Sequence, residues 1–139
     1  MTYKFVFPIQ VDTGNTDPSR HLAHHNHLVL FQKARQAYLE QFGYTERDIE
    51  GLRMFIVEAN CVYKRELFHQ DRVVVKCRVD EIKTKVFSMT YSIERDDEVC
   101  ARGYTRSVCA DPVSSKSVPL PGVFVSTISR YESLGMPMK

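Results

Sequence analysis

The residues that precede the first helical pattern are the ones whose types suit catalysis. Asp12, Asp17 and a histidine cluster lie there, and no other stretch concentrates titratable groups in this way; the histidines are His21, His24, His25 and His27. A carboxylate such as Asp17, just before a helix, can cap exposed backbone N–H groups and contribute about 0.5–2 kcal/mol. The same N–H groups can instead polarise a carbonyl oxygen while the carboxylate attacks the carbonyl or activates a water. The residues alone leave both interpretations of Asp17 open.

The histidine spacing also suggests a metal site. His24 and His27, or His21 and His25, are spaced to share one helical face, and neutral imidazole is a common zinc ligand. However, the pattern H-x-x-H-H-x-H lacks the acidic general base of the H-E-x-x-H motif of zinc hydrolases. We therefore predict no physiological metal.

Cysteine chemistry is disfavoured as well. The four cysteines have no C-x-x-C spacing, and they are Cys61, Cys77, Cys100 and Cys109. Each lies in a segment with a strand pattern, and none has a cationic neighbour at a helix terminus to activate it as a nucleophile. Buried, reduced thiols are the expected state.

Basic residues are too few and too dispersed for nucleic-acid binding. The 19 Lys and Arg exceed the 17 Asp and Glu by a net charge of +2, without the clustered cations that meet a phosphate backbone. Local cations around Arg65, around Lys85 and at Arg102 and Arg106 could still meet the phosphates of a small ligand. Such residues more often form a solvated face.

Length and composition predict one domain, residues 1–139. A chain of 139 residues can bury one core but not two, and its 43% hydrophobic and 26% charged residues are typical of globular proteins. The N-terminus lacks the pattern of a signal peptide, and no segment approaches about 18 consecutive apolar residues. We expect a cytoplasmic protein without a membrane segment.

The elements that must position these residues follow from hydrophobic periodicity. We expect residues 3–11 to form an edge strand or a strand with a break, because Pro8 removes one ladder hydrogen bond. Turn-forming residues make 12–20 a loop. Apolar residues at three- and four-residue steps predict one long helix from about His25 to Phe42, ended by Gly43. A short helical turn is expected at 45–51.

Four strand patterns follow this helix, at 53–66, 72–82, 86–95 and 98–110. Within them apolar and polar residues alternate, which indicates a sheet with one buried face, and short polar links suit antiparallel hairpins. The helix can bury its apolar face only against the concave side of this sheet. An extended tail with a last helical turn at 126–134 completes the chain.

Several of these stretches resemble one known family, the hotdog-fold acyl-CoA thioesterases of the 4-hydroxybenzoyl-CoA type. Residues 9–17 resemble the family's first strand and its V-x-x-G-D-T-D loop, and residues 21–35 resemble its helix entrance with F-E-x-A-R. Residues 63–71 are similar to the Y-x-x-P-L-x-x-G-D turn, and the likeness extends through 88–95 and 107–111. It spans nearly the entire chain.

The resemblance implies an α+β hotdog fold, in which a curled antiparallel five-stranded sheet wraps one long helix. It implies hydrolysis of an acyl-CoA to a carboxylic acid and free CoA, without a cofactor, by a homodimer or homotetramer. Asp17 would act as nucleophile or general base, and the His24 backbone N–H would help to form the oxyanion hole. Substrate binding would involve His21, His25, Arg65 and Lys85.

Three positions depart from the family pattern. Asn15 stands where the first aspartate of D-T-D occurs, Arg20 replaces a glycine, and Gln32 replaces the helix glutamate. Catalysis would therefore depend on Asp17 alone. Two alternatives stay open: a non-catalytic hotdog domain that binds acyl-CoA or a protein, and a hotdog dehydratase or hydratase. Acyl-chain specificity does not follow from the sequence.

Overall fold

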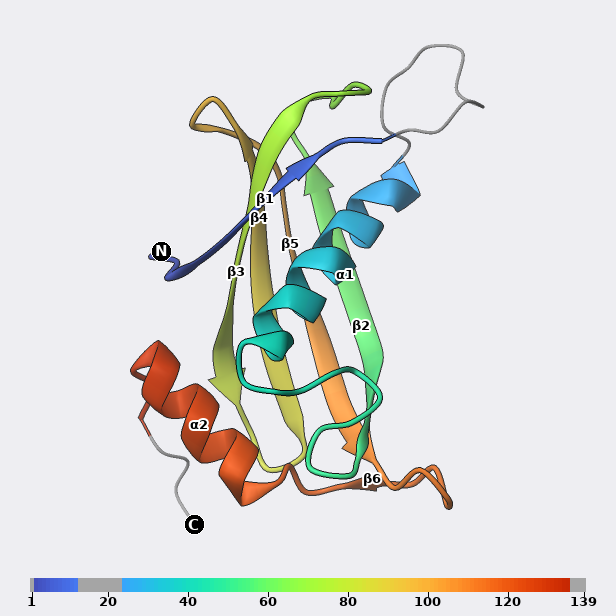
Figure 1. Ribbon diagram of the computed structural model, residues 1–139. Coiled ribbons are helices and arrows are strands. Elements are labelled where there is room, and N and C mark those ends of the chain that lie inside the picture. Colours follow the sequence, from blue (N-terminus) through green and yellow to red (C-terminus); the bar gives the residue numbers. More distant parts are fainter. Residues whose placement is uncertain (1, 13–23, 136–139) are drawn as a thin grey trace.

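A curled antiparallel sheet wraps one long helix in the computed structural model, which describes residues 2–12 and 24–135 (Figure 1). The strands are β1 (Phe5–Gln10), β2 (Arg53–Tyr63), β3 (Arg72–Ile82), β4 (Val86–Arg95), β5 (Glu98–Ala110) and β6 (Ser117–Val118). Their order is β1-β3-β4-β5-β2, and the two-residue β6 pairs with β5. The long helix is α1 (His24–Glu40), and α2 (Gly122–Glu132) lies near the C-terminus. The expected fold class is confirmed, with β6 as an addition to the five strands.

The alternation in β3 sets which face of the sheet is buried. Four apolar residues of this strand, Val73, Val75, Cys77 and Val79, are at most 4% exposed, and the residues between them lie on the other face. The link between β4 and β5 is a tight turn in which Asp96 and Asp97 have φ of 53° and 65°, a conformation that aspartate tolerates better than most residues. The two predicted hairpins are confirmed.

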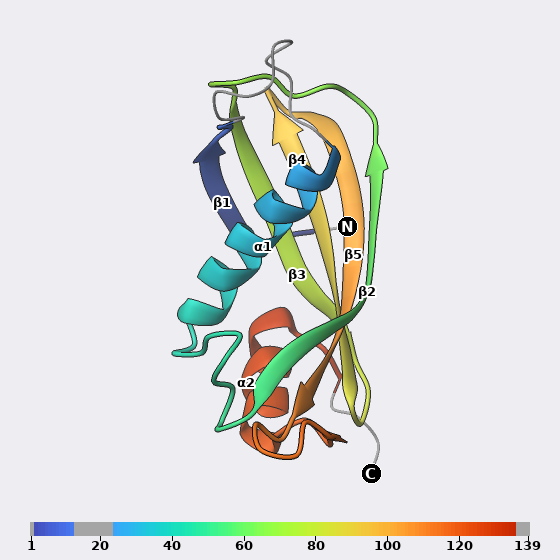
Figure 2. The same cartoon turned by 90° about the vertical axis from the view of Figure 1, so that its right-hand side faces the viewer.

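The helix α1 crosses the concave face of the sheet and packs very closely against it (Figure 2). The Phe31 ring stacks on Tyr91 of β4, with a centroid distance of 4.5 Å. Gly103 of β5 lies beneath this ring, where a Cβ would approach the Phe31 ring to 2.6 Å and overlap the backbone oxygen of Asn60 in β2. Glycine at position 103 therefore allows the helix and two strands to meet.

The segment after α1 differs from the expectation. Residues 45–51 form turns closed by two isolated bridges, Thr45 with Asp48 and Ile49 with Leu52, so the expected helical turn is wrong. These bridges satisfy backbone groups without a helix. Gly43 follows the end of α1, as predicted. It adopts a φ of +80°, a left-handed conformation that glycine reaches without steric cost.

The C-terminal helix is longer than the turn expected at 126–134, because its buried side chains anchor it. Phe124 and Ile128 are fully buried. The buried Glu132 carboxylate accepts hydrogen bonds from the Tyr38 hydroxyl at 2.6 Å and from the Val79 N–H at 3.1 Å. Burial, together with the bond to Glu132, raises the pKa of Tyr38 far above its ordinary value. Tyr38 therefore remains a donor, and Glu132 joins α2 to α1 and to β3.

The two edges of the sheet differ in character. β1 is the predicted edge strand and contains Pro8 opposite Val74. β2 forms the other edge and exposes five large apolar side chains, Phe55, Ile56, Val57, Val62 and Tyr63, which are 39–60% exposed. No helix within the described ranges has the length and apolar character needed to cross a membrane.

Candidate functional site

The residues that the sequence assigns to catalysis precede or open α1. Asp17 and His21 lie outside the described residues, as do the side chains of His24 and His25. The backbone of His24 is described and begins α1. The first four N–H groups of a helix have no acceptor inside it, and they carry the positive end of the helix dipole. The His24 N–H is one of these four groups.

The described residues that flank the segment 13–23 lie at the same end of the sheet. Before it, the Val11 N–H donates to Asp71 and the Gln70 N–H donates to Val11, each at 2.8 Å. After it, the His27 ring contacts the edge of the Tyr63 ring at the end of β2, with a centroid distance of 4.8 Å. The described residues on either side of this segment therefore lie at the end of the sheet that carries the turn 64–71.

An ion pair shapes this turn. The Asp71 carboxylate accepts from the Phe68 N–H at 2.9 Å and from Arg95 Nη1 at 2.7 Å. The same nitrogen of Arg95 donates to the Glu66 carbonyl at 3.1 Å. The hydrogen bond to Asp71 raises the pKa of Arg95, and the Leu67 side chain between these groups is fully buried.

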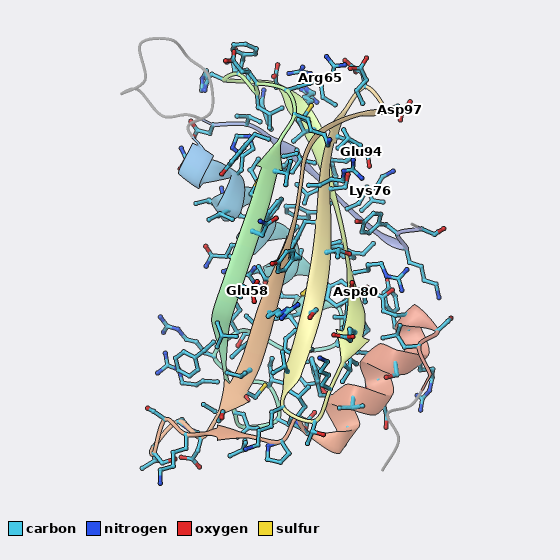
Figure 3. All side chains as sticks on the ribbon, turned by 180° about the vertical axis from the view of Figure 1, so that it is seen from behind. Glu58, Arg65, Lys76, Asp80, Glu94 and Asp97 are labelled. Atoms are coloured by element: carbon cyan, nitrogen blue, oxygen red, sulfur yellow. The ribbon has the colours of Figure 1, made fainter. Side chains whose placement is uncertain are left out.

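The two predicted substrate-binding cations lie at opposite ends of the sheet. Arg65 follows β2, at the end where α1 begins (Figure 3), and its Nε lies 2.7 Å from Glu98 Oε2 in an exposed ion pair. Lys85 is exposed in the link between β3 and β4, at the opposite end. Arg65 is thus the nearer of the two to the start of α1.

The convex face of the sheet carries mixed charge (Figure 3). Lys76 lies 3.1 Å from Glu94, and Arg106 lies 3.5 Å from Glu58. Asp80 is on the same face, and its Oδ1 is buried without a hydrogen-bond partner among the described residues. Two of the cations on this face, Lys76 and Arg106, are thus each paired with a carboxylate of a neighbouring strand.

A cavity of about 370 Å³, which we call the α1–β2 groove, lies between the first turns of α1 and the edge strand β2. Its apolar lining residues are Leu28, Val29, Phe31, Met54, Phe55, Ile56 and Ala59. Its polar lining residues are Gln32, Arg35, Glu46 and Thr105. Leu28 and Val29 are 38% and 40% exposed, so α1 leaves part of its apolar face toward this groove. The volume is within the usual range of about 300–1,000 Å³ for small-molecule sites.

A buried polar cluster forms one wall of the groove. Arg35 is 3% exposed, and its Nε donates to Glu46 Oε1 at 3.2 Å while its Nη1 donates to the Tyr91 hydroxyl at 3.1 Å. The Tyr91 hydroxyl also hydrogen bonds to Thr105 Oγ1 at 2.7 Å. Burial opposes the charge on Arg35, but Tyr91 and Glu46 outweigh burial and raise its pKa. Arg35 therefore stays a cation.

Sequence reasoning missed this cluster, although one signal was available. Arg35 occupies a core position of the helical pattern, between Phe31 and Tyr38 on the buried face of α1. A charge at such a position requires a buried partner or a function. Its partners Glu46, Tyr91 and Thr105 come from a turn, from β4 and from β5.

Within the described residues, no three His, Cys, Asp or Glu side chains are grouped to hold a metal ion. The histidine pairs considered for a metal site include His21, His24 and His25, whose side chains lie outside the described part of the chain. The four cysteines are free thiols, as expected. Burial raises the pKa of Cys109 to about 11 and raises that of Cys77 further, which keeps both thiols protonated and unreactive near neutral pH.

Comparison with known proteins identifies relatives of the whole described fold. Residues 11–128 match the family model described as the thioesterase-like superfamily. The chain is 29% identical to the 1,4-dihydroxy-2-naphthoyl-CoA hydrolase of Microcystis aeruginosa, over 68% of this chain and 70% of that protein. It is 24% identical to the acyl-CoA thioesterase YbgC of Haemophilus influenzae, over 84% of this chain and 88% of that protein. The structure of SAV2348 from Staphylococcus aureus in complex with CoA superposes with a TM-score of 0.84 at 17% identity, covering 100% of this chain and 90% of that one.

Proposed function

Because the chain belongs to the thioesterase-like superfamily, we propose that this thioesterase hydrolyses an acyl-CoA to a carboxylic acid and free CoA. Its membership confirms the family predicted from the sequence. The observation that carries the proposal is the family match over residues 11–128, which covers the segment before α1 and the strands β2 to β5. Two relatives are named for the hydrolysis of CoA thioesters, and one structural neighbour was solved with CoA.

Asp17 is our proposed catalytic carboxylate. It either attacks the thioester carbonyl carbon, expelling the CoA thiolate and leaving an anhydride for water to cleave, or it removes a proton from the attacking water. In both routes negative charge develops on the carbonyl oxygen. The His24 N–H, as the first amide of α1, supports stabilisation of that charge, since donors held at a helix N-terminus need no reorganisation.

The test replaces Asp17 with asparagine and measures release of free thiol from a panel of acyl-CoAs. Asp17→Asn should lower kcat by roughly 10²–10⁴-fold, the usual contribution of a positioned acid or base. Asp12→Asn is the matched control, because the Asp12 side chain is exposed and precedes the same segment. Both variants should keep the parent's circular dichroism. Turnover by Asp17→Asn at the parent's rate would remove Asp17 from the mechanism.

We place the CoA moiety at the end of the sheet where α1 begins. His21, His25 and Arg65 are the proposed contacts there, and Arg65 is already oriented by Glu98. Lys85, at the other end of the same protomer, would contact substrate only across a subunit interface. Calorimetric binding of acyl-CoA without thiol release would instead favour a non-catalytic binding domain.

A homodimer through β2 is the proposed assembly. The exposed apolar residues Phe55, Ile56 and Val57 border the α1–β2 groove or follow it along β2. An unpaired edge strand with such residues readily adds a second strand. Because a β2-to-β2 contact has the same patch on both sides, it closes as a symmetric dimer. The second copy would then cover the open side of the groove.

A further inference from the structure

A strained turn holds the chain directly after β1, just before the segment that bears the proposed catalytic carboxylate. Gln70 in this turn has a φ of 73°, a left-handed conformation that residues other than glycine adopt only at a cost. The Gln70 N–H donates to the Val11 carbonyl, and the Val11 N–H donates to the Asp71 carbonyl, each at 2.8 Å. Val11 is 1% exposed. The conformation of the turn therefore sets the position of Val11.

The side chains of Asp71 and Arg95 keep the turn in this conformation. The Asp71 carboxylate accepts from the Phe68 N–H at 2.9 Å and from Arg95 Nη1 at 2.7 Å. The same nitrogen of Arg95 donates to the Glu66 carbonyl at 3.1 Å. The Asp71 and Arg95 side chains are only 25% and 27% exposed, so salt screens this pair less than a fully exposed one. A strained backbone persists where several contacts of this kind determine it together.

The sheet holds Arg95 and Arg65 separately. Arg95 is the last residue of β4 and is paired with Glu98 of β5, so its backbone is fixed by the strand ladder. The Arg65 N–H donates to the Cys100 carbonyl of β5 at 3.1 Å, a bond that does not involve Arg95. Loss of the Arg95 side chain should therefore release residues 66–71 without releasing Arg65.

We propose that Arg95 is a positioning residue for the hydrolysis of acyl-CoA, an inference that rests on the proposed function. Acting through Asp71, Arg95 fixes the turn that holds Val11, and Asp17 follows shortly after Val11 in the sequence. A chain segment that is fixed at its start samples fewer conformations than one that is released there. Arg95 thus favours the conformation in which the Asp17 carboxylate reaches the thioester, without itself contacting the substrate.

The experiment measures kcat and KM of Arg95→Gln with the acyl-CoA of the panel that the parent hydrolyses best. The variant should lose roughly 10- to 100-fold in kcat, since a misplacement of about 1 Å can cost about 10²-fold. KM should change little, because Arg65 keeps its own bond to the sheet. Arg95→Lys should recover most of the loss, since one nitrogen of Arg95 makes both bonds and an ammonium group carries three donors. Lys76→Gln is the matched control: it removes the cation of the Lys76–Glu94 ion pair on the convex face and should leave kcat unchanged.

A double variant tests whether Arg95 acts through Asp17. Adding Arg95→Gln to Asp17→Asn should leave the residual kcat of Asp17→Asn unchanged, because the carboxylate that Arg95 positions is already absent. A purely structural role of Arg95 predicts the same loss in both backgrounds. A further loss of kcat in the double variant, equal to that of Arg95→Gln alone, would therefore overturn the inference.

The outcomes separate this inference from the proposed function. If the parent hydrolyses acyl-CoA and folded Arg95→Gln is equally active, the inference is wrong and the hydrolase stands. If Arg95→Gln does not fold, Asp71→Asn must show the loss of kcat instead, because it keeps an oxygen for the Phe68 N–H and removes the charge that Arg95 meets. If the parent hydrolyses no acyl-CoA, the proposed function fails and this inference fails with it.

Discussion

Gly103→Ala should destabilise the protein strongly, because the helix and two strands meet at this residue. The added Cβ would approach the Phe31 ring to 2.6 Å and overlap the Asn60 carbonyl oxygen. The ring can shift only by losing its stacking on Tyr91. The Asn60 carbonyl belongs to β2, which pairs with β5, so it cannot rotate away without breaking the hydrogen-bond ladder between these strands.

The expected cost is about 3 kcal/mol, the upper end of the roughly 1–3 kcal/mol for overpacking a well-packed core. Unfolding entropy is about 2.1 cal/mol/K per residue, which for 139 residues amounts to about 290 cal/mol/K. A loss of about 3 kcal/mol should therefore lower the Tm by about 10 °C.

The assay is thermal unfolding followed by circular dichroism, at one protein concentration, because self-association also raises the Tm. Gly122→Ala is the matched control: its Cβ meets nothing within 4 Å at the first residue of α2. It should be neutral or stabilise by about 0.4–1 kcal/mol. If the Gly103 variant unfolds within about 2 °C of the parent, the packing argument for α1 is wrong.

Two further predictions concern the sheet surface. Val57→Lys on the β2 edge should shift the proposed dimer toward a monomer, as measured by light scattering. Val123→Lys on α2 is the control and should not, since the two valines are similarly exposed, at 60% and 61%. Equal masses for both variants would refute pairing through β2. Burial raises the pKa of Asp80 in the folded protein. Ionised Asp80 therefore lowers the free energy of unfolding at pH values above the pKa that this carboxyl group has in the unfolded chain. This loss of stability disappears as the pH falls below that value. Asp80→Asn should accordingly raise the Tm at pH 8 more than at pH 4, and an equal gain at both values would contradict the stated cause.

The sequence by itself determined the elements and the face that each one buries. The alternation of Val73, Val75, Cys77 and Val79 predicted β3 and its buried side, because neighbouring residues of a strand point to opposite faces. The three- and four-residue spacing from His25 to Phe42 predicted α1 within about two residues at either end. The same local patterns, with the resemblance at residues 9–17 and 21–35, indicated the family.

Only the tertiary structure decided what surrounds the proposed site. Arg35 meets Glu46 from a turn and Tyr91 from β4, and Glu132 reaches Tyr38 across 94 positions of the chain. Arg65 follows β2 and Lys85 lies in the link between β3 and β4, so the two cations are at opposite ends of the sheet. The periodicity of apolar residues predicts which residues of a single helix or strand are buried. The partners of a buried charge are set by how the elements pack, which depends on contacts between residues distant in the chain.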